Sequence, residues 1–389
     1  LLRGEGLPCD LPRRFVFLDA TFHNGARLDV AAMLASLDQT VLLPRFLGFP
    51  VPAPDWPQLR TEGLEGLLDP ETGSQQFFKS LSNPAAGYYT YKFTEREVRA
   101  HFEALRSNPL FMEADAIIVA GVLSFCELWM PLNKTIVAVS SMGRGYMFGR
   151  CSAEEWERLD DHLRALAASE RPRHVIAANN RWDYEYLQLY LGMEPVLLEA
   201  TPWFYVQPVE WRPTRPEILV HCYKGSPPKM CPQFVGEMSQ RVEEHSAPGQ
   251  WTFKDIYEAY PRYRFQDLAQ HRAVVVWPYG FFNFAVVELY AMGLPMFVPT
   301  AQFVARLCPS MPCILNDTRF LECSNDASTL RDQGCSVSCE DCCPRHEQWK
   351  RRRSRGTAYG PERSPHPAGW PEASCHDPLA WSYWIQHAE

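Results

Sequence analysis

Apolar positions along residues 14–201 recur with two alternating periods, one of two residues and one of about 3.6 residues. Short apolar runs predict strands at 14–19, 114–120, 134–139, 173–178 and 195–198. Amphipathic spacing predicts helices at 28–37, 94–105, 125–130, 152–168 and 182–190, with a polar loop at 21–27. Because parallel neighbours need crossover connections, strands separated by helices predict a parallel sheet with helices on both faces.

The same rhythm begins again after residue 216. Here the pattern predicts strands at 217–222, 272–277 and 295–298, and helices at 231–244 and 284–292. Residues 202–216 contain four prolines and two tryptophans without a clear period, which favours a linker. We therefore expect an α/β protein with two doubly wound, Rossmann-like domains, 1–201 and 217–323, that face each other across a cleft.

Three further segments lack this rhythm. Residues 44–87 are rich in proline and glycine with little periodicity, which predicts a long loop or an irregular insertion. Residues 324–376 are rich in cysteine and basic side chains, and we expect them to be poorly ordered. Residues 377–389 predict the start of a helix that is cut short, and the chain begins Leu-Leu-Arg, so we expect a piece of a longer protein.

Helix-terminating residues support these boundaries. Gly192 follows the helix predicted at 182–190, in the place where a left-handed cap belongs, and Asn180 precedes that helix as a potential N-cap. The long apolar stretch 273–298 is interrupted by proline and glycine. It therefore predicts a strand, a turn, a helix and a strand rather than a membrane span.

Composition narrows the class of protein. The 389 residues suffice for two domains, and 46% hydrophobic with 22% charged residues is typical of a globular protein. The formal net charge of −8 argues against nucleic-acid partners and against membrane binding through bulk charge. No signal peptide is visible at the start, so we expect membrane attachment only through an anchor outside this sequence.

Thirteen cysteines and the sequons 133–135 and 316–318 favour the secretory pathway, such as the Golgi lumen, over the cytoplasm. One cluster runs from Cys335 to His346. It contains one Cys-x2-Cys pair but lacks the usual second pair of zinc ligands, so disulfides are favoured over a metal site.

The segment 274–295 carries the clearest chemistry. An apolar strand ends in a Pro/Gly loop with Tyr279, Gly280 and Asn283, a helix follows, and Glu288 lies one turn into it. Loop amides and a helix N-terminus at the carboxyl end of a parallel strand favour phosphate binding. The carboxylate of Glu288 can accept hydrogen bonds from two ribose hydroxyls. The alternative is that it merely neutralises the helix terminus.

The run Glu288-Leu-Tyr-Ala-Met-Gly293-Leu-Pro295 resembles the glutamate-containing nucleotide-sugar signature of GT-B glycosyltransferases, in which the glutamate binds the donor ribose. Seven residues upstream of Glu288 the chain has Phe281 instead of a second acid, which leaves the donor open. Residues 175–198 resemble the last β/α/β unit of the family's first domain, which implies that Asn179 faces the cleft. Two interpretations stay open: Asn179 contacts a ligand, or the Asn pair only caps the following helix through Asn180.

Residues 217–226 resemble the start of the family's second domain, close to the donor diphosphate. Lys224, Lys229 and Arg144 are candidates to offset its charge, although loop lysines are more often simply solvated. Asp19 and His23, in the loop after the first strand, are the candidate catalytic base. The chain has no Asp-x-Asp, which suits a metal-independent GT-B enzyme, and no phosphate-binding P-loop.

The sequence thus predicts a glycosyltransferase of the hexosyl or pentosyl type, without a cofactor or metal. Its partners would be a nucleotide sugar and a glycan, protein or small-molecule acceptor. Two alternatives remain open, a non-catalytic binding module on the same fold and a nucleotide-sugar epimerase.

Overall fold

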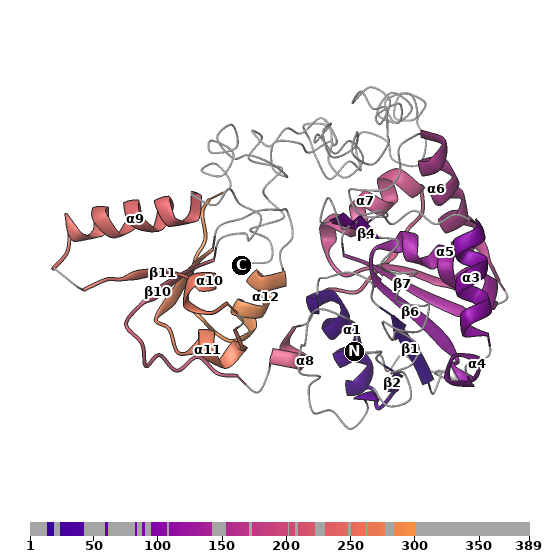
Figure 1. Ribbon diagram of the computed structural model, residues 1–389, viewed down its shortest axis with the longest axis horizontal. Coiled ribbons are helices and arrows are strands. Elements are labelled where there is room, and N and C mark those ends of the chain that lie inside the picture. The colour runs from indigo at the N-terminus through magenta and orange to yellow at the C-terminus, as the bar shows by residue number, and fades with distance from the viewer. Residues whose placement is uncertain are drawn as a thin grey trace.

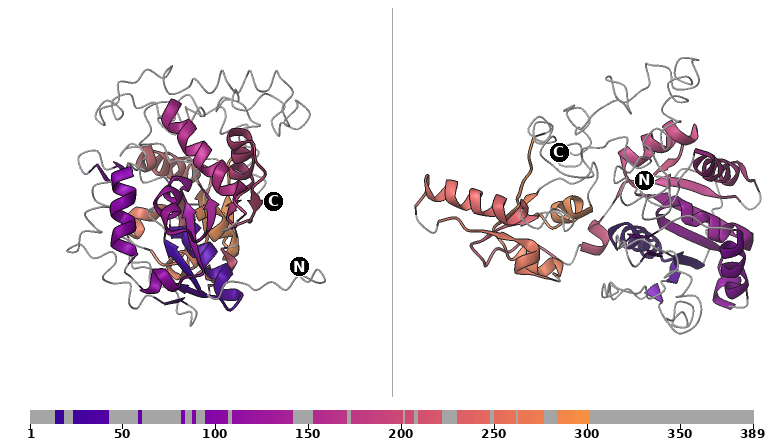
Figure 2. Two further views of the ribbon diagram at one scale, coloured as in Figure 1. Left: turned by 90° about the vertical axis from the view of Figure 1, so that its right-hand side faces the viewer. Right: turned by 45° about the horizontal axis from the view of Figure 1, so that its top comes forward.

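The computed structural model describes residues 14–18, 24–42, 59–60, 82–83, 88–89, 95–106, 109–141, 153–170, 173–200, 202–206, 209–221, 230–247, 250–261, 263–276 and 284–300. Within these residues the strands form two separate parallel sheets and one short antiparallel pair. The two sheets lie side by side in Figure 1 and in the right-hand view of Figure 2, with helices α1 and α8 between them in Figure 1. The α/β class and the two parallel sheets are confirmed.

The first sheet has seven strands in the order β3-β2-β1-β6-β7-β8-β9, and every neighbouring pair is parallel. Their bounds are Arg14–Leu18 (β1), Thr40–Leu42 (β2), Leu59–Arg60 (β3), Ala116–Gly121 (β6), Thr135–Ser140 (β7), Val175–Ala178 (β8) and Val196–Leu197 (β9). The central strand β6 is buried along its whole length, which explains its unbroken apolar sequence.

Helices lie on both sides of this sheet. Their bounds are Asn24–Ser36 (α1), Glu95–Leu105 (α3), Pro109–Glu113 (α4), Cys126–Trp129 (α5), Ala153–Ala168 (α6) and Arg181–Leu191 (α7), and 3-10 turns η1 (Leu123–Phe125) and η2 (Met130–Leu132) flank α5. Helix α1 contacts β2 and β6, and α3 and α5 lie on the opposite side of the sheet (Figure 1). Gly192 ends α7 with a φ of 65°, so its predicted cap is confirmed.

One expectation for the first half was wrong. The polar loop predicted at 21–27 gives way to helix at Asn24, because Ala26, Arg27 and Asp29 are all buried within the fold. Most of the segment 44–87, predicted as a long loop or an irregular insertion, lies outside the described residues, so that prediction is not tested. Its described residues form β3 and β4 (Ser82–Asn83), and β4 pairs antiparallel with β5 (Tyr88–Tyr89). Strands of two residues are too short to produce a recognisable period.

The second sheet has four parallel strands in the order β11-β10-β12-β13. Their bounds are Phe253–Asp255 (β11), Ile218–His221 (β10), Ala273–Val276 (β12) and Met296–Phe297 (β13). The helices are Met230–Glu243 (α9), Ile256–Ala259 (α10), Phe265–Ala269 (α11) and Phe284–Ala291 (α12), and α8 (Trp203–Val206) lies within the predicted linker. The stretch 273–298 is thus a strand, a helix and a strand, as predicted.

The hydrophobic core of the second sheet includes residues from outside it. Leu28 and Ala32 of α1 pack together with Val206 of α8 and with Leu219 and Val274 of the sheet. Helix α1 therefore contributes to both sheets, since Val30 and Ala31 on its other side belong to the core of the first. None of the helices in the described ranges is long and apolar enough to cross a membrane.

Candidate functional site

The N-terminal ends of α1 and α12 touch each other. A Cβ atom placed on Gly25 would lie 2.6 to 2.8 Å from three carbon atoms of Phe284, so this side chain packs directly on the backbone of α1. Helix α1 follows the carboxyl end of β1, and α12 follows the carboxyl end of β12. The carboxyl ends of the two sheets therefore converge at this contact, which is where open α/β sheets bind ligands.

Glu288 lies one turn further along α12 and is half-buried. Its Oε1 atom accepts a hydrogen bond of 2.7 Å from the hydroxyl of Tyr205 in α8. Burial raises the pKa of Glu288 to about 7, the Tyr205 hydrogen bond opposes this rise, and the charge of Asp29 adds to it. Near neutral pH the carboxyl group is thus close to the midpoint of its titration.

Asp29 and Tyr205 complete a cluster with Glu288 that joins three helices. Asp29 is fully buried in α1, and Tyr205 is buried in α8. Burial, together with the Glu288 carboxylate and Asp29, raises the pKa of Tyr205 well above its ordinary value, so its hydroxyl stays protonated and donates to Glu288. We call these three residues the interdomain cluster. It connects α1, which belongs to the first sheet, with α12 of the second.

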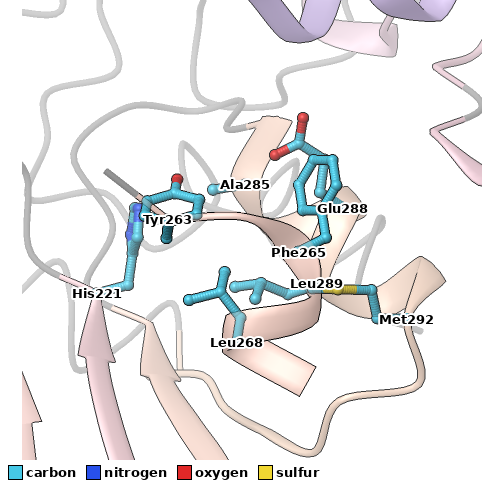
Figure 3. A pocket seen from close by; sticks show the side chains of 8 residues that line it. All are labelled: His221, Tyr263, Phe265, Leu268, Ala285, Glu288, Leu289 and Met292. Atoms are coloured by element: carbon cyan, nitrogen blue, oxygen red, sulfur yellow. The ribbon is translucent and has the colours of Figure 1, made fainter. Parts of the chain in front are cut away.

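Figure 3 shows the crevice that Glu288 shares with His221, Tyr263, Phe265, Leu268, Ala285, Leu289 and Met292. The carboxylate lies at one end, away from Leu268 and Met292 (Figure 3). The crevice formed by these residues has no interior space for a water molecule. Among the described residues, Tyr205 donates its hydroxyl hydrogen to Glu288 Oε1, while none donates a hydrogen bond to Oε2.

His221 ends β10 and is buried at the base of the same crevice. Its Nε2 atom lies 3.4 Å from the hydroxyl of Tyr257. Burial lowers the pKa of His221 to about 4, so the ring is neutral near pH 7. The neutral imidazole of His221 is thus a second titratable side chain in the lining of the crevice.

Polar side chains also gather at the carboxyl ends of β7 and β8. Asn180 caps α7, because its Oδ1 atom accepts from the backbone N–H of Asp183 at 2.8 Å. Its Nδ2 atom donates to Asn179 and to Asp183, and Ser140 Oγ donates to Asp183 at 2.8 Å. The capping role of Asn180 is confirmed, while ligand contact by Asn179 stays a prediction.

A separate cavity of about 440 Å³ lies between α9 and the second sheet. Phe234 and Met238 of α9 face Phe253, Val275 and Phe297 across it. Of the described residues in the lining, Ser246 and Trp251 have a polar group in the side chain and the others are apolar. None of the described residues that line this cavity carries a charged side chain.

No family model matches the chain, and no curated protein matches it. Similar solved structures include the glycosyltransferase SnogD from Streptomyces nogalater, at 12% identity over 74% of this chain and 82% of that chain, with a TM-score of 0.37. CalG4, the calicheamicin glycosyltransferase, is 14% identical over 87% of this chain and 94% of its own, with a TM-score of 0.36.

The glycotransferase of kitacinnamycin is 12% identical over 97% of this chain and 96% of that chain, with a TM-score of 0.33. All three similar structures are thus glycosyltransferases.

Of the predicted site residues, Glu288 and Asn179 lie in the described part of the chain. The others lie outside it, namely Asp19, His23, Arg144, Lys224, Lys229, Tyr279, Gly280 and Asn283. Two of these residues directly precede the helices that touch. His23 precedes Asn24, the first residue of α1, and Asn283 precedes Phe284, the first residue of α12. The cysteine cluster 335–346 is also outside the described residues, among which no group of three or more potential ligands could hold a metal ion.

The sequence reasoning missed Asp29, Tyr205 and His221. A signal existed for Asp29, which is the one charged residue in the otherwise apolar run 28–35. Tyr205 gave no such signal, because it lies 83 residues from Glu288 in sequence and sits among the prolines of the predicted linker.

Proposed function

We propose that this protein is a metal-independent glycosyltransferase that moves a sugar from a nucleotide-sugar donor to a hydroxyl group of an acceptor. The observation that carries the proposal is the contact of Gly25 with Phe284, which brings the carboxyl ends of both sheets together beside Glu288. A two-substrate transfer needs such convergence, since each sheet can then present one substrate to the other.

In this proposal the second sheet binds the donor. The amides of Tyr279, Gly280 and Asn283 and the N-terminus of α12 would bind the diphosphate. Glu288 would accept hydrogen bonds from the ribose hydroxyls through its ionised form, and such bonds would favour ionisation and lower its pKa. Lys224, Lys229 and Arg144 are proposed to offset the diphosphate charge, and Asn179 is proposed to contact a substrate from the first sheet.

The chemical step needs a base and a stabilised leaving group. Asp19 or His23 would take the proton from the acceptor hydroxyl as its oxygen attacks the anomeric carbon of the donor sugar. The bond from that carbon to the diphosphate oxygen breaks, and the nucleoside diphosphate leaves with the electron pair. The helix N-terminus and the proposed cations stabilise the charge that develops on it.

The test is a thermal-shift screen of nucleotide sugars followed by turnover of an isotope-labelled donor, with and without EDTA. A true donor raises the unfolding temperature, because it binds only the folded state. Glu288→Ala should raise the KM for the donor by about tenfold or more, through loss of charge-assisted hydrogen bonds. Glu237→Ala, on the exposed side of α9, is the matched control and should leave KM unchanged.

Other outcomes decide between functions. Binding of a donor without turnover would favour a binding module, and conversion of the donor without an acceptor would favour an epimerase. If no nucleotide sugar binds at millimolar concentration, the enzyme proposal is wrong. Loss of activity in EDTA would contradict metal independence alone.

A further inference from the structure

Tyr205 donates a hydrogen bond to Glu288 from outside the second sheet. It lies in α8, within the connection between the two sheets and 83 residues before Glu288. The distance of 2.7 Å between the two oxygens is typical of a hydroxyl that donates to a carboxylate. Helix α8 contacts both α1 and α12, so the packing of three helices brings this hydroxyl to the carboxyl group.

The ring of Tyr205 is held firmly in place. Tyr205 is 6% exposed and belongs to the same hydrophobic core as Val206 and Leu289. Its ring lies against the ring of Phe265 in α11, with 6.1 Å between the centroids and 45° between the planes. Because the phenol oxygen lies on the axis about which the ring rotates, the packing of the ring fixes its position before any ligand binds.

The hydrogen bond orients the carboxylate of Glu288. The last torsion of a glutamate side chain has a broad energy profile, so a carboxylate without a partner samples many orientations. Here Oε1 accepts from Tyr205, and none of the described residues donates to Oε2. The side chain is half-buried, and its carboxylate lies at one end of the crevice in Figure 3. An oriented carboxylate loses less entropy when its second oxygen binds a hydroxyl group.

The same hydrogen bond affects how much of Glu288 is ionised near neutral pH. Burial raises the pKa of Glu288 to about 7, and the bond from Tyr205 opposes this rise. The other titratable groups around it are Asp29 of α1, His221 of β10 and Tyr263, just before α11. All three stay in place when the hydroxyl of Tyr205 alone is removed, so a change in the pKa of Glu288 would report on that one bond.

We propose that Tyr205 is a positioning residue of the donor site, which holds the carboxylate of Glu288 in the orientation that binds a hydroxyl group of the donor. This inference rests on the proposed transferase function and adds a residue to its donor site. Since Tyr205 comes from the connection between the sheets, donor affinity depends on how α8 packs against α1 and α12. Tyr205 therefore acts on the KM for the donor rather than on kcat.

The experiment compares Tyr205→Phe with the wild type, using the full chain and three ribose-containing probes, UDP-glucose, UDP-N-acetylglucosamine and GDP-mannose. Calorimetry between pH 5.5 and 8.5 measures their binding. Because the ionised form of Glu288 accepts the hydrogen bond, wild-type affinity should rise with pH around a midpoint near 7. Tyr205→Phe should move this midpoint upward by about one pH unit and weaken binding at pH 7 by about five- to tenfold. The difference should narrow towards pH 8.5.

Tyr184→Phe is the matched control. Tyr184 of α7 donates to Glu194 at 3.0 Å in an exposed position, so the variant loses the same kind of bond outside the interdomain cluster. Its donor affinity and midpoint should equal those of the wild type. A second substitution, 3-fluorotyrosine in place of Tyr205, keeps the ring and donates a stronger hydrogen bond. It should move the midpoint downward, and it decides the question if Tyr205→Phe does not fold.

Three outcomes would overturn the positioning role while the transferase proposal stands. Tyr205→Phe could bind the nucleotide sugar as the wild type does at every pH, or it could lower kcat without raising KM. It could also weaken binding by one constant factor with no change of midpoint, which is the result expected of a purely structural hydroxyl. If the wild type binds no nucleotide sugar, the transferase proposal fails, and the positioning role fails with it.

Discussion

At the scale of single residues, Glu288 and His221 affect the pH dependence of stability in opposite directions. The pKa of Glu288 is raised from 4.5 to about 7 in the folded protein, so this carboxyl group loses its proton at lower pH in the unfolded chain than in the folded one. Its contribution to the free energy of unfolding therefore falls as the pH rises from about 4.5 to about 7. The pKa of His221 is lowered to about 4, so its contribution is complete above about 6.5 and is lost as pH falls towards 4. Over their shared range the two effects oppose each other.

Glu288→Gln should isolate the first effect. The glutamine keeps an acceptor for Tyr205 but cannot ionise, so the variant should match the wild type near pH 4.5. By pH 7.5 the variant should be more stable than the wild type by on the order of 2 kcal/mol. The free energy of unfolding of the variant itself should rise with pH, because the contribution of His221 rises and no ionisation of residue 288 offsets it. Denaturant unfolding of both proteins at several pH values measures this difference.

Glu237→Gln on the exposed face of α9 provides the control, and its difference from the wild type should not vary over this pH range. A constant difference between Glu288→Gln and the wild type would show that the carboxyl group ionises equally in the folded and unfolded chain.

At the scale of elements, the ends of α7 were readable from sequence because capping is local. Asn180 and Gly192 each satisfy backbone groups within four residues, so their chemistry appears in the sequence itself. The missed elements include β2, β3, β11, α10 and α11, which have two to five residues each, less than the window that reveals a period. They form because the tertiary fold provides their partners.

Gly192 offers a test of the cap. Its φ of 65° is left-handed, and no atom lies within 4 Å of the position that a Cβ atom would take, so any cost of substitution comes from the backbone alone. Gly192→Ala should destabilise the protein by about 1 kcal/mol, and Gly192→Asn should recover part of this loss because asparagine tolerates that conformation better. Thermal unfolding of the two variants checks the order. Equal stability of both variants and the wild type would contradict it.

The candidate site could be predicted only in part, because some of its residues have local sequence signals and others are brought together by packing. Glu288 was found because a strand, a loop, a helix and Gly293 surround it within one short segment. Its partners Tyr205 and Asp29 come from α8 and α1, and only the packing of those helices brings them together. Sequence periodicity identifies an element but does not say which distant element it will contact.

At the scale of the whole molecule, Gly25 controls how closely the two sheets approach. Gly25→Ala would place a methyl group 2.6 to 2.8 Å from Phe284, so the variant should lose about 1 to 3 kcal/mol or hold the helices further apart. Gly236→Ala in α9 is the matched control, because nothing lies within 4 Å of its Cβ, and it should be neutral or more stable by up to about 1 kcal/mol.

The double variant Gly25→Ala with Phe284→Leu should recover stability relative to Gly25→Ala, since leucine can make room where the ring cannot. Denaturant unfolding of the four proteins provides the comparison. If Gly25→Ala behaves like Gly236→Ala, then α1 and α12 are not in close contact in solution.

Because α1 contributes residues to both hydrophobic cores, it also affects how hybrids of this protein with another can be designed. Leu28 and Ala32 fill the second core, while Val30 and Ala31 fill the first. A hybrid in which the segment after residue 201 is exchanged for that of another protein would therefore pair a foreign core with a native helix that was not shaped for it. A hybrid that keeps both cores native-like should therefore exchange residues 24–36 together with the segment after residue 201. This requires one crossover on each side of α1, in addition to the one in the proline-rich connection.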